Sequence, residues 1–241
     1  MSKQGRDRSR AKRIVEQQKA AERRRKVTLW TTIGVVLVLV AAGLTGWAVT
    51  AGKDTGKVNT PSVAVDSGTA FTVGSGPVVI DLYEDFMCPI CHEFETQSGA
   101  TIKQFVTANK VTVRYHPVAI LDPNSNGTQY STRSAGAAAA AAVGGKFIEY
   151  HDVLYQNQPA EGSSGLTNAK LIELGKSVGL TTSAFADAIN NKTYDGWATK
   201  VTDTFSARGY TGTPTVLVAG KQLTGVPTPA QLTDAVNKAA A

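Results

Sequence analysis

The sequence predicts an α/β domain in which helices cover a sheet and a helical insertion divides the chain, preceded by one N-terminal transmembrane helix. Three observations support this prediction. Short apolar segments typical of strands occur at residues 78–83, 111–115 and 215–218. Helical periodicity fills the intervals between them, and an uncharged segment over residues 27–52 precedes them all. Strands that alternate with helices in this way are typical of a sheet with helices on its faces.

The first 50 residues are typical of a membrane anchor. Residues 1–26 hold eleven Lys and Arg against three Asp and Glu, a formal charge of +8, so the rest of the chain carries −2. Residues 27–50 are uncharged, and about 20 apolar residues span a bilayer. Because the positive charges flank only the N-terminal side, we expect a cytoplasmic tail, a single-pass anchor and an extracytoplasmic domain in a bacterial cell membrane. A cleaved signal peptide is the alternative. No aromatic residue interrupts the basic tail, so nucleic-acid binding is not expected.

Residues 51–68 are rich in Gly, Thr, Ser and Val and predict a tether, so residues 69–241 form one domain. Within it, residues 70–73 predict a short edge strand, and Gly76-Pro77 introduces the first main strand. A helix follows and ends near Asn109. Its apolar residues recur at helical spacing and form one face: Cys91, Phe94, Ile102 and Phe105.

The second half of the domain is mostly helical. The strand at 111–115 alternates apolar and polar residues and is limited by Pro117. From about 128 to 208, apolar periodicity predicts five helices, separated by turn residues such as Gly144-Gly145. A hairpin over 215–224 and a last helix with Leu232 and Val236 complete the chain.

The segment Cys88-Pro89-Ile90-Cys91 contains the only two cysteines of the sequence. It directly follows a predicted strand and begins a helix, which is typical of a redox-active pair. Pro89 suits the first helical position, and the helix N-terminus stabilises an anion at Cys88. We therefore expect a lowered pKa and the nucleophile at Cys88, with Cys91 as the resolving thiol. A structural disulfide closing so small a loop would constrain the unfolded chain little, which favours catalysis.

Three motifs resemble those of the DsbA-like thiol–disulfide oxidoreductases. Residues 88–95 are similar to the family's C-P-x-C-x-x-F-E helix, and residues 83–86 resemble the connection before it. Residues 212–220 resemble its G-x-P-T-hydrophobic-x-G segment. The resemblance covers about 70–241 and implies a thioredoxin-like fold, with a helical insertion at about 128–208 and a cis Thr213–Pro214 bond beside the thiols. It implies no cofactor, with Cys88 and Cys91 catalytic and supported by Pro89, Ile90, Thr213, Pro214, Glu95 and His92.

The sequence also departs from the family pattern. Ile90 replaces the histidine of the most oxidising members, which predicts a weaker oxidant, between about −120 and about −270 mV. Leu82 occupies the position where thioredoxin carries a buried carboxylate. Other titratable residues near the motif are expected to be structural. We expect exposed carboxylates at Glu84, Asp85 and Glu93, and packing or surface histidines at His116 and His151.

Three other functions are weaker predictions. Cys88–His92 spells C-x-x-C-H, the attachment motif of c-type haem, but the strand before it and the Thr213-Pro214 segment fit haem binding poorly. Zinc is not expected, because two cysteines and scattered histidines do not form the usual set of four ligands. The third alternative is an interaction module that keeps the same fold but carries out no thiol–disulfide exchange.

The sequence therefore predicts an extracytoplasmic, disulfide-donating oxidase that acts on secreted or cell-envelope proteins with free thiols. The resemblance implies reoxidation by a quinone-coupled membrane partner of the DsbB or vitamin K epoxide reductase-like type. A reductase fed by a membrane electron donor, for example in cytochrome maturation, is the alternative.

Overall fold

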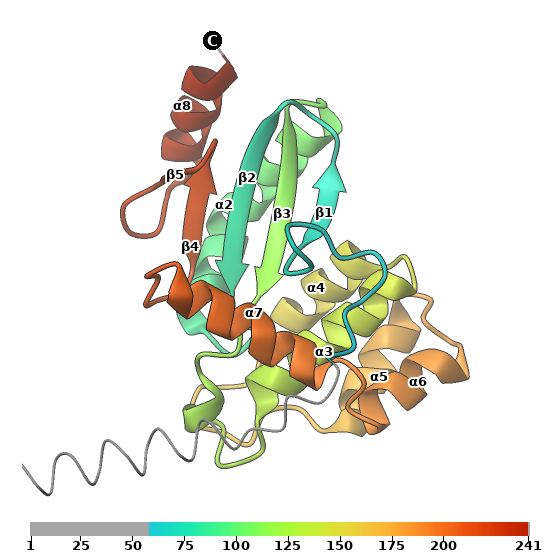
Figure 1. Ribbon diagram of the computed structural model, residues 1–241. Coiled ribbons are helices and arrows are strands. Elements are labelled where there is room, and N and C mark those ends of the chain that lie inside the picture. Colours follow the sequence, from blue (N-terminus) through green and yellow to red (C-terminus); the bar gives the residue numbers. More distant parts are fainter. Residues whose placement is uncertain (1–57, 241) are drawn as a thin grey trace, which may run out of the picture. The chain divides into compact units, whose positions relative to one another are not determined.

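One mixed five-stranded sheet forms the centre of the domain in the computed structural model, which describes residues 58–240 (Figure 1). The strands lie in the order β1-β3-β2-β4-β5. β2 and β3 are parallel, whereas β1 pairs antiparallel with β3, β4 with β2, and β5 with β4. The predicted edge strand, main strands and hairpin are confirmed. The strands are β1 Phe71–Gly74, β2 Val78–Glu84, β3 Val111–Pro117, β4 Thr215–Val218 and β5 Lys221–Gln222.

Helices cover both faces of the sheet. α2 (Pro89–Thr107) contacts β1 and β3, α8 (Pro229–Ala240) contacts β2 and β4, and the two helices contact each other. α7 (Asp195–Ala207) crosses the other face, in front of the sheet in Figure 1, with α2 behind it. The apolar face predicted for α2 is buried against the sheet.

A helical insertion lies between β3 and β4, as predicted. α3 is its centre and contacts α4, α5, α6 and α7. Residues 135–142 of α3 are all buried, because Ala and Gly are small enough to let several helices approach closely. The predicted span of 128–208 also includes α7, which packs on the sheet as well: the Trp197 ring lies 4.9 Å from Phe71. The other elements are the 3₁₀ helix η1 Asp122–Asn124, α3 Tyr130–Val143, α4 Phe147–Gln156, α5 Asn168–Ser177 and α6 Ser183–Asn190.

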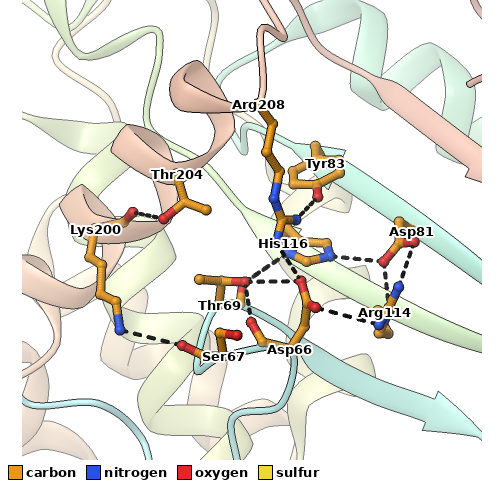
Figure 2. Close-up of polar contacts among 10 residues, drawn as sticks. All are labelled: Asp66, Ser67, Thr69, Asp81, Tyr83, Arg114, His116, Lys200, Thr204 and Arg208. Atoms are coloured by element: carbon orange, nitrogen blue, oxygen red, sulfur yellow. Dashed lines mark hydrogen bonds and ion pairs between the residues drawn. The ribbon is translucent and has the colours of Figure 1, made fainter. Parts of the chain in front are cut away.

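A polar network holds the segment before β1 on the sheet (Figure 2). Asp66 pairs with Arg208 at 3.0 Å and with Arg114 at 3.5 Å. Arg114 donates two further hydrogen bonds to Asp81, at 2.6 and 2.8 Å. The His116 ring lies 3.2 Å from the same carboxylate. The sequence predicts a tether up to residue 68, but Asp66 and its neighbours belong to the packed domain.

Within residues 58–240, no helix combines the length and the apolar character needed to cross a bilayer. The predicted basic tail (1–26) and anchor (27–50) lie outside the described residues. The transmembrane helix and the membrane location therefore stay predictions.

Candidate active site

The two cysteines lie at the N-terminal end of α2, as the sequence predicts. Cys88 is the N-cap residue with extended backbone angles (φ −73°, ψ 116°), and Pro89 begins the helix. A proline there costs no helical hydrogen bond. Cys91 lies one turn further along, with 0% of its surface exposed against 6% for Cys88. Both are free thiols, so the structure represents the reduced pair.

The surroundings of the two thiols separate their pKa values. A hydrogen bond from the Cys91 thiol, aided by the N–H groups of Ile90 and Cys91, lowers the pKa of Cys88 to about 6 in spite of burial. Burial raises the pKa of Cys91 well above its usual range, and the sulfur of Cys88 and the carboxylate of Glu84 raise it further. Cys88 is therefore the thiolate and candidate nucleophile at neutral pH, while Cys91 keeps its proton.

The loop before β4 lies beside these thiols. The Thr213–Pro214 peptide bond is cis, as predicted. The Cys88 Sγ atom lies 3.4 Å from the carbonyl oxygen of Thr213, although the two residues are 125 positions apart. The sheet creates this proximity, because β2 and β4 are paired neighbours with Tyr83 opposite Thr215. Because the two strands are antiparallel, the turn after β2 and the loop before β4 lie at the same end of the sheet.

A buried carboxylate shapes the turn between β2 and α2. Asp85 is fully buried and accepts hydrogen bonds from the N–H of Met87 (2.9 Å), the N–H of Leu121 (2.9 Å) and the hydroxyl of Ser131 (2.7 Å). Burial raises its pKa to about 6. The prediction of an exposed carboxylate at this position is wrong. Asp85 is buried through tertiary contacts, because Ser131 of the insertion and the segment after β3 cover its side chain.

The helical insertion also fixes the backbone of the active-site turn. Gln158, just after α4, donates through Nε2 to the carbonyl oxygens of Phe86 (3.1 Å) and Cys88 (2.9 Å). The hydroxyl of Tyr155 lies 3.4 Å from the carbonyl oxygen of Asp85. Sequence reasoning missed Gln158, because no local pattern indicates a contact over 70 positions.

Three more titratable side chains gather between β2, α2 and α4. Ligand-type atoms of Glu84, Glu95 and His151 all lie within 4.8 Å of one another, and His151 Nε2 is 3.1 Å from Glu84 Oε2. Burial raises the pKa of Glu84, and burial with repulsion from Glu84 raises the pKa of Glu95 to about 8. Burial alone would lower the pKa of His151, but Asp152 and Glu84 raise it to about 10.

Glu84 is not the exposed helix carboxylate that the sequence suggests. It is 4% exposed and is the last residue of β2. Side chains alternate along a strand, so Glu84 shares a face with Ile80 and Leu82, and that alternation is the signal that could have revealed it. Glu84 is therefore a buried carboxylate two residues after Leu82, and it helps to raise the pKa of Cys91. His151 is buried, as a packing histidine would be, but it is also bonded to Glu84.

The remaining predicted support residues lie at the rim. Pro89 is exposed, Ile90 is 43% exposed, and Glu93 is exposed as expected. The half-buried ring of His92 lies edge-on to Tyr155, with 6.4 Å between centroids. The part that these side chains play in the reaction stays a prediction.

A profile of the family described as thioredoxin matches residues 66–238. The chain belongs to the thioredoxin family. This thioredoxin-family chain is 32% identical to reduced DsbA of Mycobacterium tuberculosis, covering 71% of this chain and 92% of that one with a TM-score of 0.62. For reduced DsbG of the same organism the identity is 33%, the coverage 72% and 88%, and the TM-score 0.63. The predicted resemblance to DsbA-like thiol–disulfide oxidoreductases is confirmed, as is the thioredoxin-like fold with its helical insertion.

Two curated relatives of the thioredoxin-family chain are much longer proteins. The serine/threonine-protein kinase PknE of M. tuberculosis is 30% identical over 157 residues, which cover 60% of this chain and 27% of the kinase. The Na(+)/H(+) antiporter NhaA 3 of Salinispora tropica is 26% identical over 207 residues, or 79% of this chain and 30% of the antiporter. The chain therefore spans less than a third of either protein, and the match concerns a segment of each.

Proposed function

We propose that this protein thiol–disulfide oxidoreductase is a disulfide donor for secreted or cell-envelope proteins, with Cys88 and Cys91 as its catalytic residues. One observation carries the proposal: Cys88 is the N-cap residue of α2, where its pKa is lowered to about 6, while Cys91 is fully buried one turn along and its pKa is raised. A stabilised Cys88 thiolate favours the reduced pair, which makes the oxidised pair a stronger oxidant. A thiol with a low pKa is also a good leaving group in disulfide exchange.

The reaction runs in two exchange steps. A substrate thiolate attacks the sulfur of Cys88 in the Cys88–Cys91 disulfide, forming a mixed disulfide, and Cys91 leaves and takes up a proton. A second substrate thiolate then attacks the substrate sulfur of the mixed disulfide, and Cys88 leaves as the stabilised thiolate. The substrate loses two electrons and gains a disulfide, and the cysteine pair gains the two electrons. The carbonyl of Thr213 beside Cys88 offers an acceptor for an extended substrate backbone.

The proposal extends to location and reoxidation. Residues 1–50 support a single-pass anchor with a cytoplasmic N-terminus and an extracytoplasmic catalytic domain. With no third cysteine in the chain, the two electrons leave by exchange with another protein. The likeness to DsbA supports a quinone-coupled membrane partner of the DsbB or vitamin K epoxide reductase-like type. The alternative, a reductase fed by a membrane electron donor, is favoured by Ile90 in place of the histidine of strong oxidants.

The reduction potential of the full-length protein in a glutathione buffer series separates these directions. A potential of about −120 to −180 mV supports a disulfide donor, and one near about −270 mV supports the reductase. Cys88→Ser is expected to abolish exchange, and Cys91→Ser to accumulate mixed disulfides with substrate proteins in cells. An active Cys88→Ser variant, or Cys91→Ser cells without mixed disulfides, would refute the mechanism. Visible absorbance of the purified protein would reveal a c-type haem instead.

A further inference from the structure

The cluster of Glu84, Glu95 and His151 has a composition that the exchange reaction alone does not require. The three residues come from β2, α2 and α4, so the fold brings together groups separated by 11 and 56 positions. Within residues 58–240, Glu84 Oε1 and Glu95 Oε1 are buried and have no hydrogen-bond partner. Glu84 and His151 are only 4% and 2% exposed. Buried polar atoms of this kind are costly unless a proton, a water or an ion satisfies them.

The geometry fits a small divalent cation. Zinc binds carboxylate oxygen and imidazole nitrogen at about 2.0–2.2 Å, which puts neighbouring ligand atoms of a tetrahedron about 3.4 Å apart. His151 Nε2 and Glu84 Oε2 already lie 3.1 Å apart, and an oxygen of Glu95 lies within 4.8 Å of both. To close the set, an oxygen of Glu95 has to approach the other two ligand atoms from within 4.8 Å to about 3.4 Å. One nitrogen and two carboxylates suit zinc better than Ca²⁺, which takes six to eight oxygen ligands.

The surroundings supply what a zinc site needs beyond its protein ligands. Asp152 Oδ1 lies 3.5 Å from His151 Nδ1, the arrangement in which a carboxylate orients a metal-binding histidine. The other oxygen of Asp152 pairs with Lys103 at 2.6 Å. Three carboxylates, one lysine and one divalent ion give zero net charge when His151 is neutral. A cavity of about 180 Å³, lined by Glu95, Asp152 and Tyr155 among others, borders one of the three ligands, Glu95.

We propose that Glu84, Glu95 and His151 form a binding site for a divalent transition-metal ion of the zinc type, with Asp152 orienting His151. The sequence lacks a compact metal motif because the three ligands lie on three separate elements. Binding requires both carboxylates ionised and His151 neutral, so the metal displaces the protons held there. The site is independent of the direction of disulfide exchange.

Zinc binding is tested on full-length protein with the Cys88–Cys91 disulfide formed, so that no thiolate competes as a ligand. Ellman's reagent verifies that no free thiol remains. Metal-free protein is titrated with ZnCl₂ against a chromophoric chelator, with CaCl₂ in parallel. We expect one zinc per chain and much weaker Ca²⁺ binding. Glu95→Gln should lower the zinc affinity more than tenfold, and Asp152→Asn by about 10–100-fold.

Glu93→Gln is the matched control, because it makes the same change on the same helix at an exposed position. It should leave the affinity unchanged. Equal affinities of Glu95→Gln and Glu93→Gln, or the absence of stoichiometric zinc binding, would overturn the proposal. If Glu95→Gln does not fold, imidazole NMR of the unmodified chain decides, because it has only three histidines. Zinc should shift the His151 signals, and shifts confined to His92 or His116 would contradict the site.

Discussion

The hydrogen bond from Cys91 to Cys88 has an effect that a pair of substitutions can measure. It is the largest of the contributions that bring the pKa of Cys88 to about 6. A hydrogen bond to a charged group contributes about 1.5–3 kcal/mol, and one pKa unit corresponds to about 1.4 kcal/mol. Removing this donor in Cys91→Ala should therefore raise the pKa of Cys88 by about 1–2 units, to about 7–8. Cys91→Ser keeps a hydroxyl donor at the same place, and its Cys88 pKa should stay nearer to 6.

The assay is the pH dependence of Cys88 alkylation by iodoacetamide, checked by the ultraviolet absorbance of the thiolate. At pH 7 a thiol with a pKa of about 6 is about 90% ionised, whereas one with a pKa of about 8 is about 10% ionised. The alkylation midpoint should move upward in Cys91→Ala and little in Cys91→Ser. Equal midpoints near 6 in both variants would refute the reasoning. The helix N-terminus and its backbone N–H groups would then account for the lowered pKa without the Cys91 thiol.

Three further predictions concern the scaffold. Trp197→Ala empties a fully buried site and should lower the free energy of unfolding by about 3–5 kcal/mol, measured in urea, and an effect under about 1 kcal/mol would contradict the packing. Gln158→Ala leaves two carbonyl oxygens of the active-site turn without their donor and should cost about 1–3 kcal/mol, seen as a lower melting temperature. Asp81→Asn tests the network of Figure 2. Burial alone would raise the pKa of Asp81, but hydrogen bonds from His116 and Arg114 lower it below its usual value. Its stabilising effect is therefore present above about pH 4 and is lost as the pH falls below that. The stability difference between wild type and Asp81→Asn should be constant near neutral pH and shrink in acid, and a constant difference at all pH values would contradict this assignment.

Much of the fold and the two thiols follow from local patterns. Strand alternation and helical periodicity depend on neighbours within a few residues, so β1 to β4 and the helices are predictable segment by segment. Pro89 after Cys88 places a thiol at a helix N-terminus whatever the rest of the chain does. The cis Thr213–Pro214 bond is implied only by the resemblance of residues 212–220 to the DsbA-like motif, and the structure has it.

The burial and contacts of the polar groups around the thiols depend on tertiary packing instead of local sequence. Glu84 and Asp85 look exposed in the sequence because both precede a helix N-terminus, yet β2 and the insertion enclose them. Gln158 reaches the active-site turn only because α4 packs against it.

The sequence by itself determined the redox pair, its helix, the α/β class and the resemblance to DsbA-like proteins. The tertiary structure alone decided which side chains surround the pair: the Glu84, Glu95 and His151 cluster, the Gln158 contact and the attachment of Asp66 to the sheet. The physical reason is the distance along the chain over which each effect acts. Backbone preference and periodicity act over one or two turns of chain, whereas burial and charge pairing depend on which distant elements the packing of the insertion brings together.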